Sequence, residues 1–281
     1  MIIIKGAGDL ASGTALRLFH AGFEILMTET KQPAAVRRTV SFCRAVYEGS
    51  AQVEDITAVL TDSAGIAEAL RKKQIPVIID PEASSVRELQ PAVLIDAIMA
   101  KRNTGTRIED APLVIGLGPG FTAGFDCHAV IETKRGHTLG RVITQGSAIP
   151  NTGIPGDIGG FTRERLLVSA GDGIFEAKAE IGDLVKKGGV LGVIHTSEGN
   201  EIFLRAEIDG VLRGLLPSGI PVHKGMKAGD IDPRCEKWHC FTVSDKALAI
   251  AGGVLEAALR GGFLPAASRF AGKIADASLC V

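Results

Sequence analysis

The sequence predicts an α/β protein in which a parallel sheet is followed by a small all-β module and a final helix. In the first half of the chain, short apolar runs alternate with helix-like segments, which is typical of a doubly wound sheet. Between residues 168 and 232, a glycine-rich pattern of short β-branched runs occurs twice. Ser244 then precedes a helical pattern that extends to about Arg260. The expected division is 1–165 for the α/β domain, 166–232 for the β module, 233–264 for the returning helix and 265–281 for a tail.

Composition is that of a globular protein. The 281 residues favour two domains over one, and 46% are hydrophobic against 22% charged. A net charge of −1 gives no basic field for nucleic acid or an anionic membrane. The start, MIIIKGAGD, turns polar too soon for a signal peptide, and no apolar run approaches the roughly 20 residues of a membrane helix. Five cysteines suit a reducing compartment, so we expect a cytoplasmic protein.

The first βα turn matches a dinucleotide fingerprint. An apolar strand at residues 2–5 leads into Gly6, Gly8 and Ala11 in the GxGxxA pattern, and the second strand ends at Glu29. This predicts a Rossmann-like domain. Backbone N–H groups would hold a phosphate at the helix start, and Glu29 would bind a ribose hydroxyl.

Asp9 argues against a simple dinucleotide site, because it lies where a pyrophosphate would bind. Two unit charges about 5 Å apart at an effective dielectric of about 20 repel by roughly 3 kcal/mol. A helix end typically offers an anion only ~0.3–1 kcal/mol. Asp9 is therefore either the N-cap of a ligand-free loop or a cation ligand beside a phosphate.

The βα alternation continues through residue 96. We expect a helix at 34–47 carrying Arg37 and Arg38. The further elements are strands at 56–60, 75–79 and 92–95, and helices at 63–73 and 84–89. Asp80 and Asp96 follow two of these strands, where parallel sheets bind ligands, although each can instead cap a following helix. Lys101 and Asn103 fit either ligand contacts or a solvated helix end.

Residues 116–140 contain a cluster of side chains that are suited to catalysis or ligand binding. An apolar strand at 113–117 leads into Gly118 and Gly120, whose turn can form an anion-binding nest even though Pro119 departs from the Rossmann pattern. Cys127 and His128 follow, and then Lys134.

Cys127 is the candidate nucleophile of this stretch. An unperturbed thiol, with a pKa of about 8.5, is only a few per cent thiolate at neutral pH, and His128 or Lys134 would increase that fraction. Adjacent strand residues face opposite ways, so Cys127 is alternatively a buried structural thiol. The glycine-rich loop at 151–156 is either a lid or a domain linker.

The repeat has an offset of 37 residues and seven identical pairs. They are Gly173/Gly210, Gly182/Gly219, Val185/Val222, Lys187/Lys224, Gly188/Gly225, Gly192/Gly229 and Ile194/Ile231. Two such units resemble the barrel-sandwich hybrid fold of biotinyl and lipoyl domains. The joining stretch 195–209 has no lysine, so we expect no covalent biotin or lipoate, and a structural or docking module instead.

The last segment offers little chemistry. Cys235, His239 and Cys240 are too few ligands for a closed zinc site, and we expect no metal. Gly252 and Gly253 lie inside the predicted final helix, where each costs roughly 1 kcal/mol against alanine. Close packing against another backbone would explain them, so we expect this helix to return to the sheet.

Several motifs together resemble the YqeB-type family of accessory proteins for selenium-dependent molybdenum hydroxylases. They include GAGDLASG, the region of Glu29, Arg37 and Arg38, IDAIMAKRN, GLGPGFTAGFDCHAVIETKRGHTLGRVI, NTGIPG and SDKALAIAGGVLEAAL. The resemblance reaches about residue 264 and implies a cytoplasmic role in maturing a molybdenum hydroxylase. It assigns no catalytic residues. The glycine loop also resembles that of XdhC-type factors, which assist sulfuration of molybdenum cofactor.

Three hypotheses follow. In the first, a maturation factor binds a dinucleotide or molybdopterin-nucleotide through Gly6, Gly8, Asp9, Glu29, Asp80, Asp96, Lys101, Gly118 and Gly120. Cys127 would relay sulfur or selenium beside His128 and Lys134. In the second, the chain is an NAD(P)-dependent oxidoreductase. In the third, it is a non-catalytic scaffold that holds the hydroxylase client. The expected partners are that client, other maturation proteins and a nucleotide ligand, and a homo-oligomer is possible.

Overall fold

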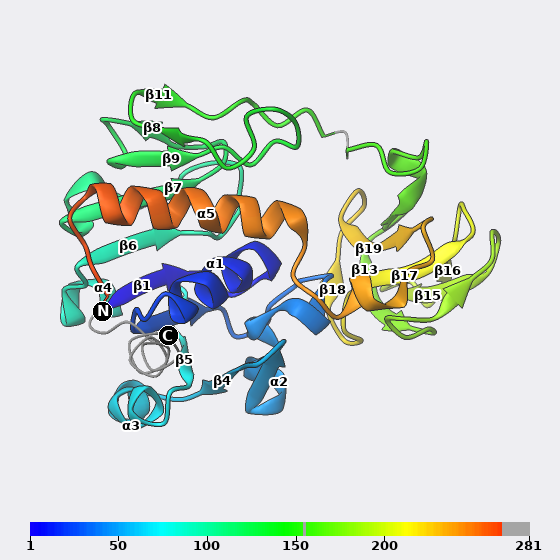
Figure 1. Ribbon diagram of the computed structural model, residues 1–281. Helices are drawn as coiled ribbons and strands as arrows, with labels where there is room; N and C mark the ends of the chain where they lie inside the picture. Colours follow the sequence, from blue (N-terminus) through cyan, green and yellow to red (C-terminus); the bar gives the residue numbers. More distant parts are fainter. Residues whose placement is uncertain (154–155, 266–281) are drawn as a thin grey trace, which may run out of the picture.

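The computed structural model describes residues 1–153 and 156–265 and contains one large sheet beside a separate β module (Figure 1). The large sheet has nine strands. In chain order they are β1 (Ile2–Lys5), β2 (Ile25–Glu29), β3 (Ser50–Val53), β4 (Ile56–Leu60), β5 (Ile75–Ile79), β6 (Val93–Asp96), β7 (Leu113–Leu117), β9 (Ala129–Ile131) and β10 (Val142–Ile143). The helices are α1 (Asp9–His20), α2 (Ala45–Glu48), α3 (Ile66–Arg71), α4 (Ser85–Leu89) and α5 (Asp245–Arg260). Within the described residues, no helix is both long and apolar enough to cross a bilayer.

The sheet confirms the predicted parallel α/β class. Its strand order is β10-β9-β7-β6-β1-β2-β5-β4-β3, and every neighbouring pair from β9 to β4 is parallel. Only the edge strands β10 and β3 pair antiparallel. The next strand in the chain after β1 lies on one side of it, whereas β6 lies on the other, so the order reverses between β1 and β6.

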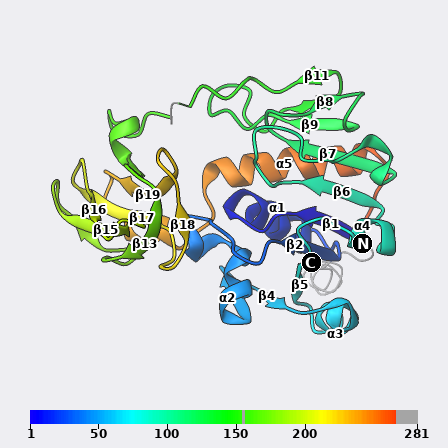
Figure 2. The same cartoon turned by 180° about the vertical axis from the view of Figure 1, so that it is seen from behind.

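Both faces of the sheet are buried, which explains why its strands are continuous apolar runs. In β1, Ile2 and Ile4 enter the core under α1 and α5, while Ile3 enters a separate apolar cluster on the other face. Helices α1 and α5 lie side by side across the first face, as Figures 1 and 2 show from opposite sides. The second face is covered by α4, by residues such as Phe121, and by a two-stranded sheet of β8 (Thr122–Ala123) and β11 (Gly146–Ser147).

The predicted helix at 34–47 is wrong. This segment forms two 3₁₀ turns, Arg38–Val40 and Phe42–Arg44, before the four residues of α2. Tertiary contacts outweigh helix propensity here. The Val36 carbonyl accepts a hydrogen bond from the Leu215 N–H, and Arg38 Nε donates to the Leu215 carbonyl. The segment thus attaches the β module to the large sheet.

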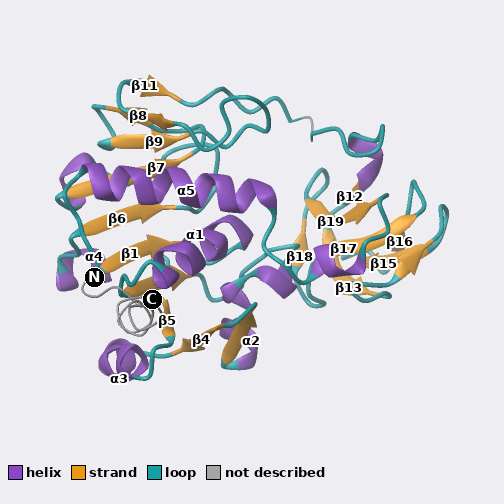
Figure 3. Ribbon diagram, viewed as in Figure 1, coloured by secondary structure: helices purple, strands orange, loops and turns teal. Residues whose placement is uncertain are grey.

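The β module contains two four-stranded sheets (Figure 3). Its strands are β12 (Leu166–Val168), β13 (Gly173–Ala177), β14 (Leu184–Val185), β15 (Val190–His195), β16 (Glu201–Arg205), β17 (Gly210–Leu215), β18 (Pro221–Val222) and β19 (Lys227–Asp232). One sheet has the order β12-β19-β17-β14 and the other β16-β15-β13-β18. Shifting each strand by one repeat converts the first order into the second. The duplication in the sequence is therefore a structural duplication, with each sheet built from both copies.

Helix α5 returns to the large sheet as predicted, but only one of its two glycines packs against another backbone. The Ser244 side chain caps it by accepting a hydrogen bond from the Ala247 N–H. A Cβ on Gly253 would lie 2.1 Å from the Gly140 carbonyl oxygen, so only glycine allows this approach. A Cβ on Gly252 would meet only the Arg17 guanidinium, at 3.5 Å.

We therefore expect opposite effects from two adjacent substitutions. Gly253→Ala should lower the free energy of unfolding by about 1–3 kcal/mol, because backbone must move to admit the methyl group. Gly252→Ala, the matched control, should leave it unchanged or raise it by up to ~1 kcal/mol through helix propensity. Chemical denaturation measures both, and equal destabilisation would contradict the proposed packing role of Gly253.

Candidate functional site

A cavity of about 800 Å³ lies between the large sheet and the β module. Its sheet side is formed by segments that follow β1, β6, β7 and β9, represented by Asp9, Lys101, Pro119 and Lys134. These segments all leave the carboxyl edge of the sheet, next to the reversal of strand order between β1 and β6. Open α/β sheets bind their ligands in this crevice. The size is that of an ordinary small-molecule site.

The cavity is strongly basic. Among its described lining residues, eight are cationic and two are carboxylates. The cations are Arg37, Lys101, Lys134, Arg135, Arg165, Arg213, Lys227 and Lys246, and the carboxylates are Asp9 and Asp230. Asp245 neutralises Arg135 through two hydrogen bonds of 2.5 and 2.9 Å. About five positive charges are left without a carboxylate in a chain whose net charge is −1. This concentration predicts an anionic ligand.

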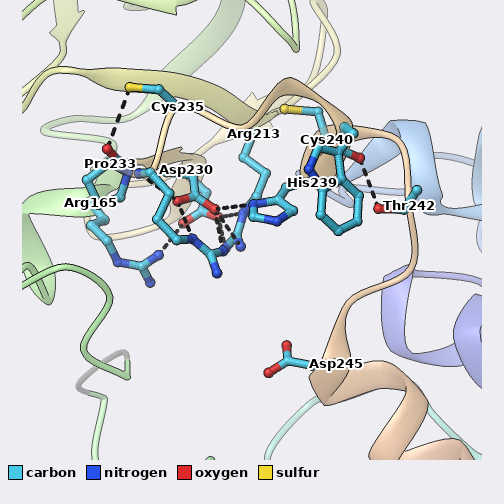
Figure 4. A network of polar contacts seen from close by, with 12 residues as sticks. Arg165, Arg213, Asp230, Pro233, Cys235, His239, Cys240, Thr242 and Asp245 are labelled. Carbon is cyan, nitrogen blue, oxygen red and sulfur yellow. Dashed lines mark hydrogen bonds and ion pairs between the residues drawn. The ribbon is translucent and has the colours of Figure 1, made fainter.

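The β-module side of the cavity centres on Asp230, which is 1% exposed (Figure 4). Arg213 bonds its Oδ2 through Nε and Nη2, while Arg165 Nη1 lies 3.8 Å from Oδ1. Burial by itself would raise the pKa of Asp230, but Lys227, Arg213 and Arg165 outweigh it and hold that pKa below its usual value. Asp230 is therefore ionised, and it accepts hydrogen bonds from Arg213 but not from Arg165.

Arg165 and Arg37 are buried arginines with unused donors. Arg165 is 4% exposed, and its Nε and Nη1 make no hydrogen bond within the described residues. Arg37 is 6% exposed; its Nη2 donates to the His239 carbonyl, but its Nε has no partner in the same residues. Burial lowers the pKa of both guanidinium groups, and Arg213 lowers each further. Buried donors of this kind are normally satisfied, and guanidinium groups are common ligands of oxyanions.

The opposite side of the cavity combines two helix starts with a lysine. Helices α1 and α5 begin at Asp9 and Asp245, next to the cavity lining. Lys246 lines the cavity from the first turn of α5. Burial lowers its pKa, Asp9 opposes that change, and Arg135 and Lys227 reinforce it. The N-termini of helices favour bound anions. Lys246, which lies near other cations, would also be stabilised by a bound anion.

Glu132 holds in place two of the loops that line the cavity. It is 2% exposed, and its two oxygens accept hydrogen bonds from the backbone N–H groups of Lys134 and Ile149. Both of those residues line the cavity. Glu132 is thus a positioning residue.

Of the residues predicted to bind a cofactor, Asp9 and Lys101 line the cavity, as does the predicted catalytic Lys134. Asp9 is not the N-cap of α1, since Gly8 holds that position without a side-chain bond. Gly118 and Gly120 flank the lining residue Pro119, but each packs against protein. A Cβ would lie 2.4 Å from Thr133 Oγ1 at Gly118 and 2.7 Å from the Arg102 backbone at Gly120. Whether these residues bind a ligand stays a prediction.

The remaining predicted acids have protein partners. Glu29 accepts hydrogen bonds from the Ala7 and Thr30 N–H groups, so it braces the Gly6 loop where a ribose contact was expected. Asp80 caps α4 by accepting from the Ser84 and Ser85 N–H groups. Asp96 is 2% exposed; it accepts from Thr106 at 2.6 Å and lies 3.3 Å from Lys5 Nζ. The segment after Asp96 leads to a 3₁₀ turn at Ile108–Asp110, so Asp96 does not cap an α-helix, and Asn103 holds the intervening loop together.

Cys127 and His128 do not lie beside the cavity, which corrects the expected site. They precede β9, at the amino edge of the sheet, whereas Lys134 follows β9 at the carboxyl edge. Cys127 is 0% exposed in the apolar cluster of the second face, and burial raises its pKa to about 11. His128 is exposed and accepts the Val114 N–H through Nδ1. This placement argues against a relay at Cys127.

Sequence reasoning missed most of the cationic lining. Arg165, Arg213, Lys227 and Lys246 come from distant segments, and nothing local distinguishes them from surface charges. One signal was present. Lys227 and Asp230 replace Val190 and Val193 at the equivalent positions of the first repeat. Polar substitutions in one copy of a duplicated strand indicate a special environment.

The fold and this cavity define a class: an α/β protein with a basic cavity between its parallel sheet and a duplicated β module. No protein-family model matches the sequence. The chain is 50% identical over 258 residues to the uncharacterized protein YqeB of Escherichia coli (strain K12). That alignment covers 92% of this chain and 47% of YqeB, so the chain spans about half the length of this relative. Over these residues, the identity supports the resemblance to the YqeB-type family.

Likeness to solved structures is low. An aspartoacylase family protein from Mesorhizobium loti aligns with a TM-score of 0.25 and 14% identity, over 80% of this chain and 86% of that one. The apo ectoine utilization protein EutE from Ruegeria pomeroyi aligns with a TM-score of 0.26 and 10% identity. This alignment covers 82% of this chain and 85% of that one. Scores of this size carry no argument about fold or activity.

The burial of Cys127 predicts a selective labelling pattern. In the native protein at neutral pH, a maleimide should modify the exposed Cys235 and spare Cys43, Cys127 and Cys240, because those three thiols are buried. Peptide mass spectrometry measures each site separately, and labelling in denaturant controls for intrinsic reactivity. Modification of native Cys127 as fast as Cys235 would show that its thiol is accessible.

The acid side of the stability profile should depend on Asp232. Burial opposes its ionisation, but hydrogen bonds from Arg234 lower its pKa from an ordinary 3.8 to about 2. A carboxylate with a lowered folded pKa stabilises the protein above its unfolded pKa, and that contribution is lost as the pH falls toward the folded pKa. The free energy of unfolding should therefore fall between about pH 4 and pH 2. Asp232→Asn should flatten this slope; an unchanged slope would refute the assignment.

Proposed function

We propose that the chain is an accessory factor in the maturation of a selenium-dependent molybdenum hydroxylase, and that it binds a nucleotide or pterin-nucleotide in the basic cavity. The maturation role rests on the YqeB-type resemblance. The observation that carries the binding role is the excess of positive charge in a crevice of nucleotide size, at the reversal point of a parallel sheet. A pterin-nucleotide combines flat aromatic rings with phosphates, and the cavity offers the apolar side chains of Leu10, Met99 and Ile149 beside its cations.

The β module would then present this ligand or dock the client. Its two interleaved sheets are consistent with the barrel-sandwich hybrid of biotinyl and lipoyl domains, adapted here without an attachment lysine. In this proposal the module acts through Arg165, Arg213 and Lys227, which form one wall of the cavity. The docking and ligand-binding roles are compatible.

The oxidoreductase alternative is weaker. Its ribose-binding residue would be Glu29, but both carboxylate oxygens of Glu29 already accept backbone N–H groups. Burial also raises the pKa of Glu29, so the site is poorer as an anionic acceptor.

The test is the small molecule that co-purifies with the full chain, measured by mass spectrometry alongside client maturation. The wild-type chain should carry a phosphorylated ligand, and client activity should fall when the chain is absent. Lys246→Ala should reduce the bound ligand at least tenfold, because its ammonium lines the cavity. The surface variant Lys187→Ala is the matched control. Full client activity without the chain would refute the maturation role.

A further inference from the structure

The uncompensated cations of the cavity form two groups on facing walls. The module wall comprises Arg37, Arg165, Arg213 and Lys227, and the sheet wall comprises Lys101, Lys134 and Lys246. Arg37 belongs to the module wall because its neighbour Val36 pairs with Leu215 of β17. Each wall has one lining carboxylate, Asp230 or Asp9. Both walls therefore keep an excess of positive charge.

The module wall is a built oxyanion site. Arg37 and Arg165 are each more than nine-tenths buried and belong to the cavity lining, and the Nε atom of each has no hydrogen-bond partner within the described residues. The nearby carboxylate, Asp230, is engaged by Arg213 through two nitrogens. A guanidinium fork matches the oxygens of a phosphate, and buried N–H donors that lack a hydrogen bond are costly to keep. An anionic group placed here would recover that cost.

The sheet wall has a different character. Its lysines are point charges; Lys101 and Lys134 are exposed, and Lys246 is partly buried at the start of α5. The start of α1 lies beside them, with Asp9 as the opposing charge. Such a wall attracts a phosphate without fixing its orientation.

We propose that the cavity binds a ligand with at least two phosphoryl groups, one held by Arg37 and Arg165 on the module wall and another by the lysines of the sheet wall. This inference rests on the proposed function and narrows its ligand to phosphoanhydrides and bis-phosphorylated compounds. Two terminal phosphates carry about −3 to −4, and an anhydride with one terminal phosphate about −2.5 to −3, so both approach the excess of positive charge more closely than the roughly −2 of two carboxylates. The ligand bridges the β module and the large sheet.

Inorganic phosphate and tripolyphosphate are the probes, measured by calorimetry on the full chain. Tripolyphosphate affinity should fall at least tenfold in Arg165→Gln and also in Lys134→Gln. Phosphate affinity should fall in Arg165→Gln and stay within twofold in Lys134→Gln, because a single phosphate occupies the module wall. Lys187→Gln, outside the cavity, should change neither.

Arg165→Lys provides a second variant in case Arg165→Gln unfolds. Lysine keeps the positive charge but lacks the planar guanidinium group that can bind two oxygens at once. It should weaken both probes at least threefold while circular dichroism stays unchanged. Tripolyphosphate binding that responds to only one wall, or to neither, overturns the bridging ligand. A loss of phosphate affinity in both Arg165→Gln and Lys134→Gln also overturns the bridging ligand, because the two walls would then act as a single site. None of these outcomes depends on client activity, so the inference and the maturation role fail separately.

Discussion

Uncompensated positive charge held out of water at the cavity is the constraint on which the rest of the structure depends. Arg165 and Arg213 both lie within ion-pair distance of the buried Asp230, Arg213 also reaches the buried Asp232, and Arg37 is buried nearby. An arginine cannot shed its proton at physiological pH, so it cannot relieve burial as a lysine does. The surrounding fold must therefore hold these side chains against their mutual repulsion, and the energy for this comes from packing elsewhere.

The fold supplies that support from two directions. On the sheet side, loops at the carboxyl edge are tied by buried or paired carboxylates: Glu29 holds the Gly6 loop, Glu132 holds the loops of Lys134 and Ile149, and Asp245 holds Arg135. On the module side, the Val36 carbonyl and the Arg37 side chain connect the segment after β2 to β17 and to the turn at His239. Glu29, which sequence reasoning assigned to a ligand, thus helps to hold the protein that surrounds the cavity.

The sequence predicts the elements well and the site poorly, for physical reasons. Strand β1 is recognisable because both faces are buried, and α5 because Ser244 caps it and Gly253 requires a close neighbour. The prediction of a helix at 34–47 is wrong because hydrogen bonds to the β module determine the backbone conformation of that segment. The cavity could not be predicted because its cations come from seven separate segments of the chain, and only the tertiary structure brings these segments together.

The location of Cys127 changes what a maturation role requires of this chain. A relay needs an accessible thiolate next to the bound cofactor, yet Cys127 is sealed in hydrocarbon at the opposite edge of the sheet. None of the described cysteines lines the cavity. The arrangement instead suits tight, reversible holding of a polyanion, whose charge compensates the arginines. A factor of this kind would contribute by binding and presenting the cofactor, while another component supplies the sulfur or selenium chemistry.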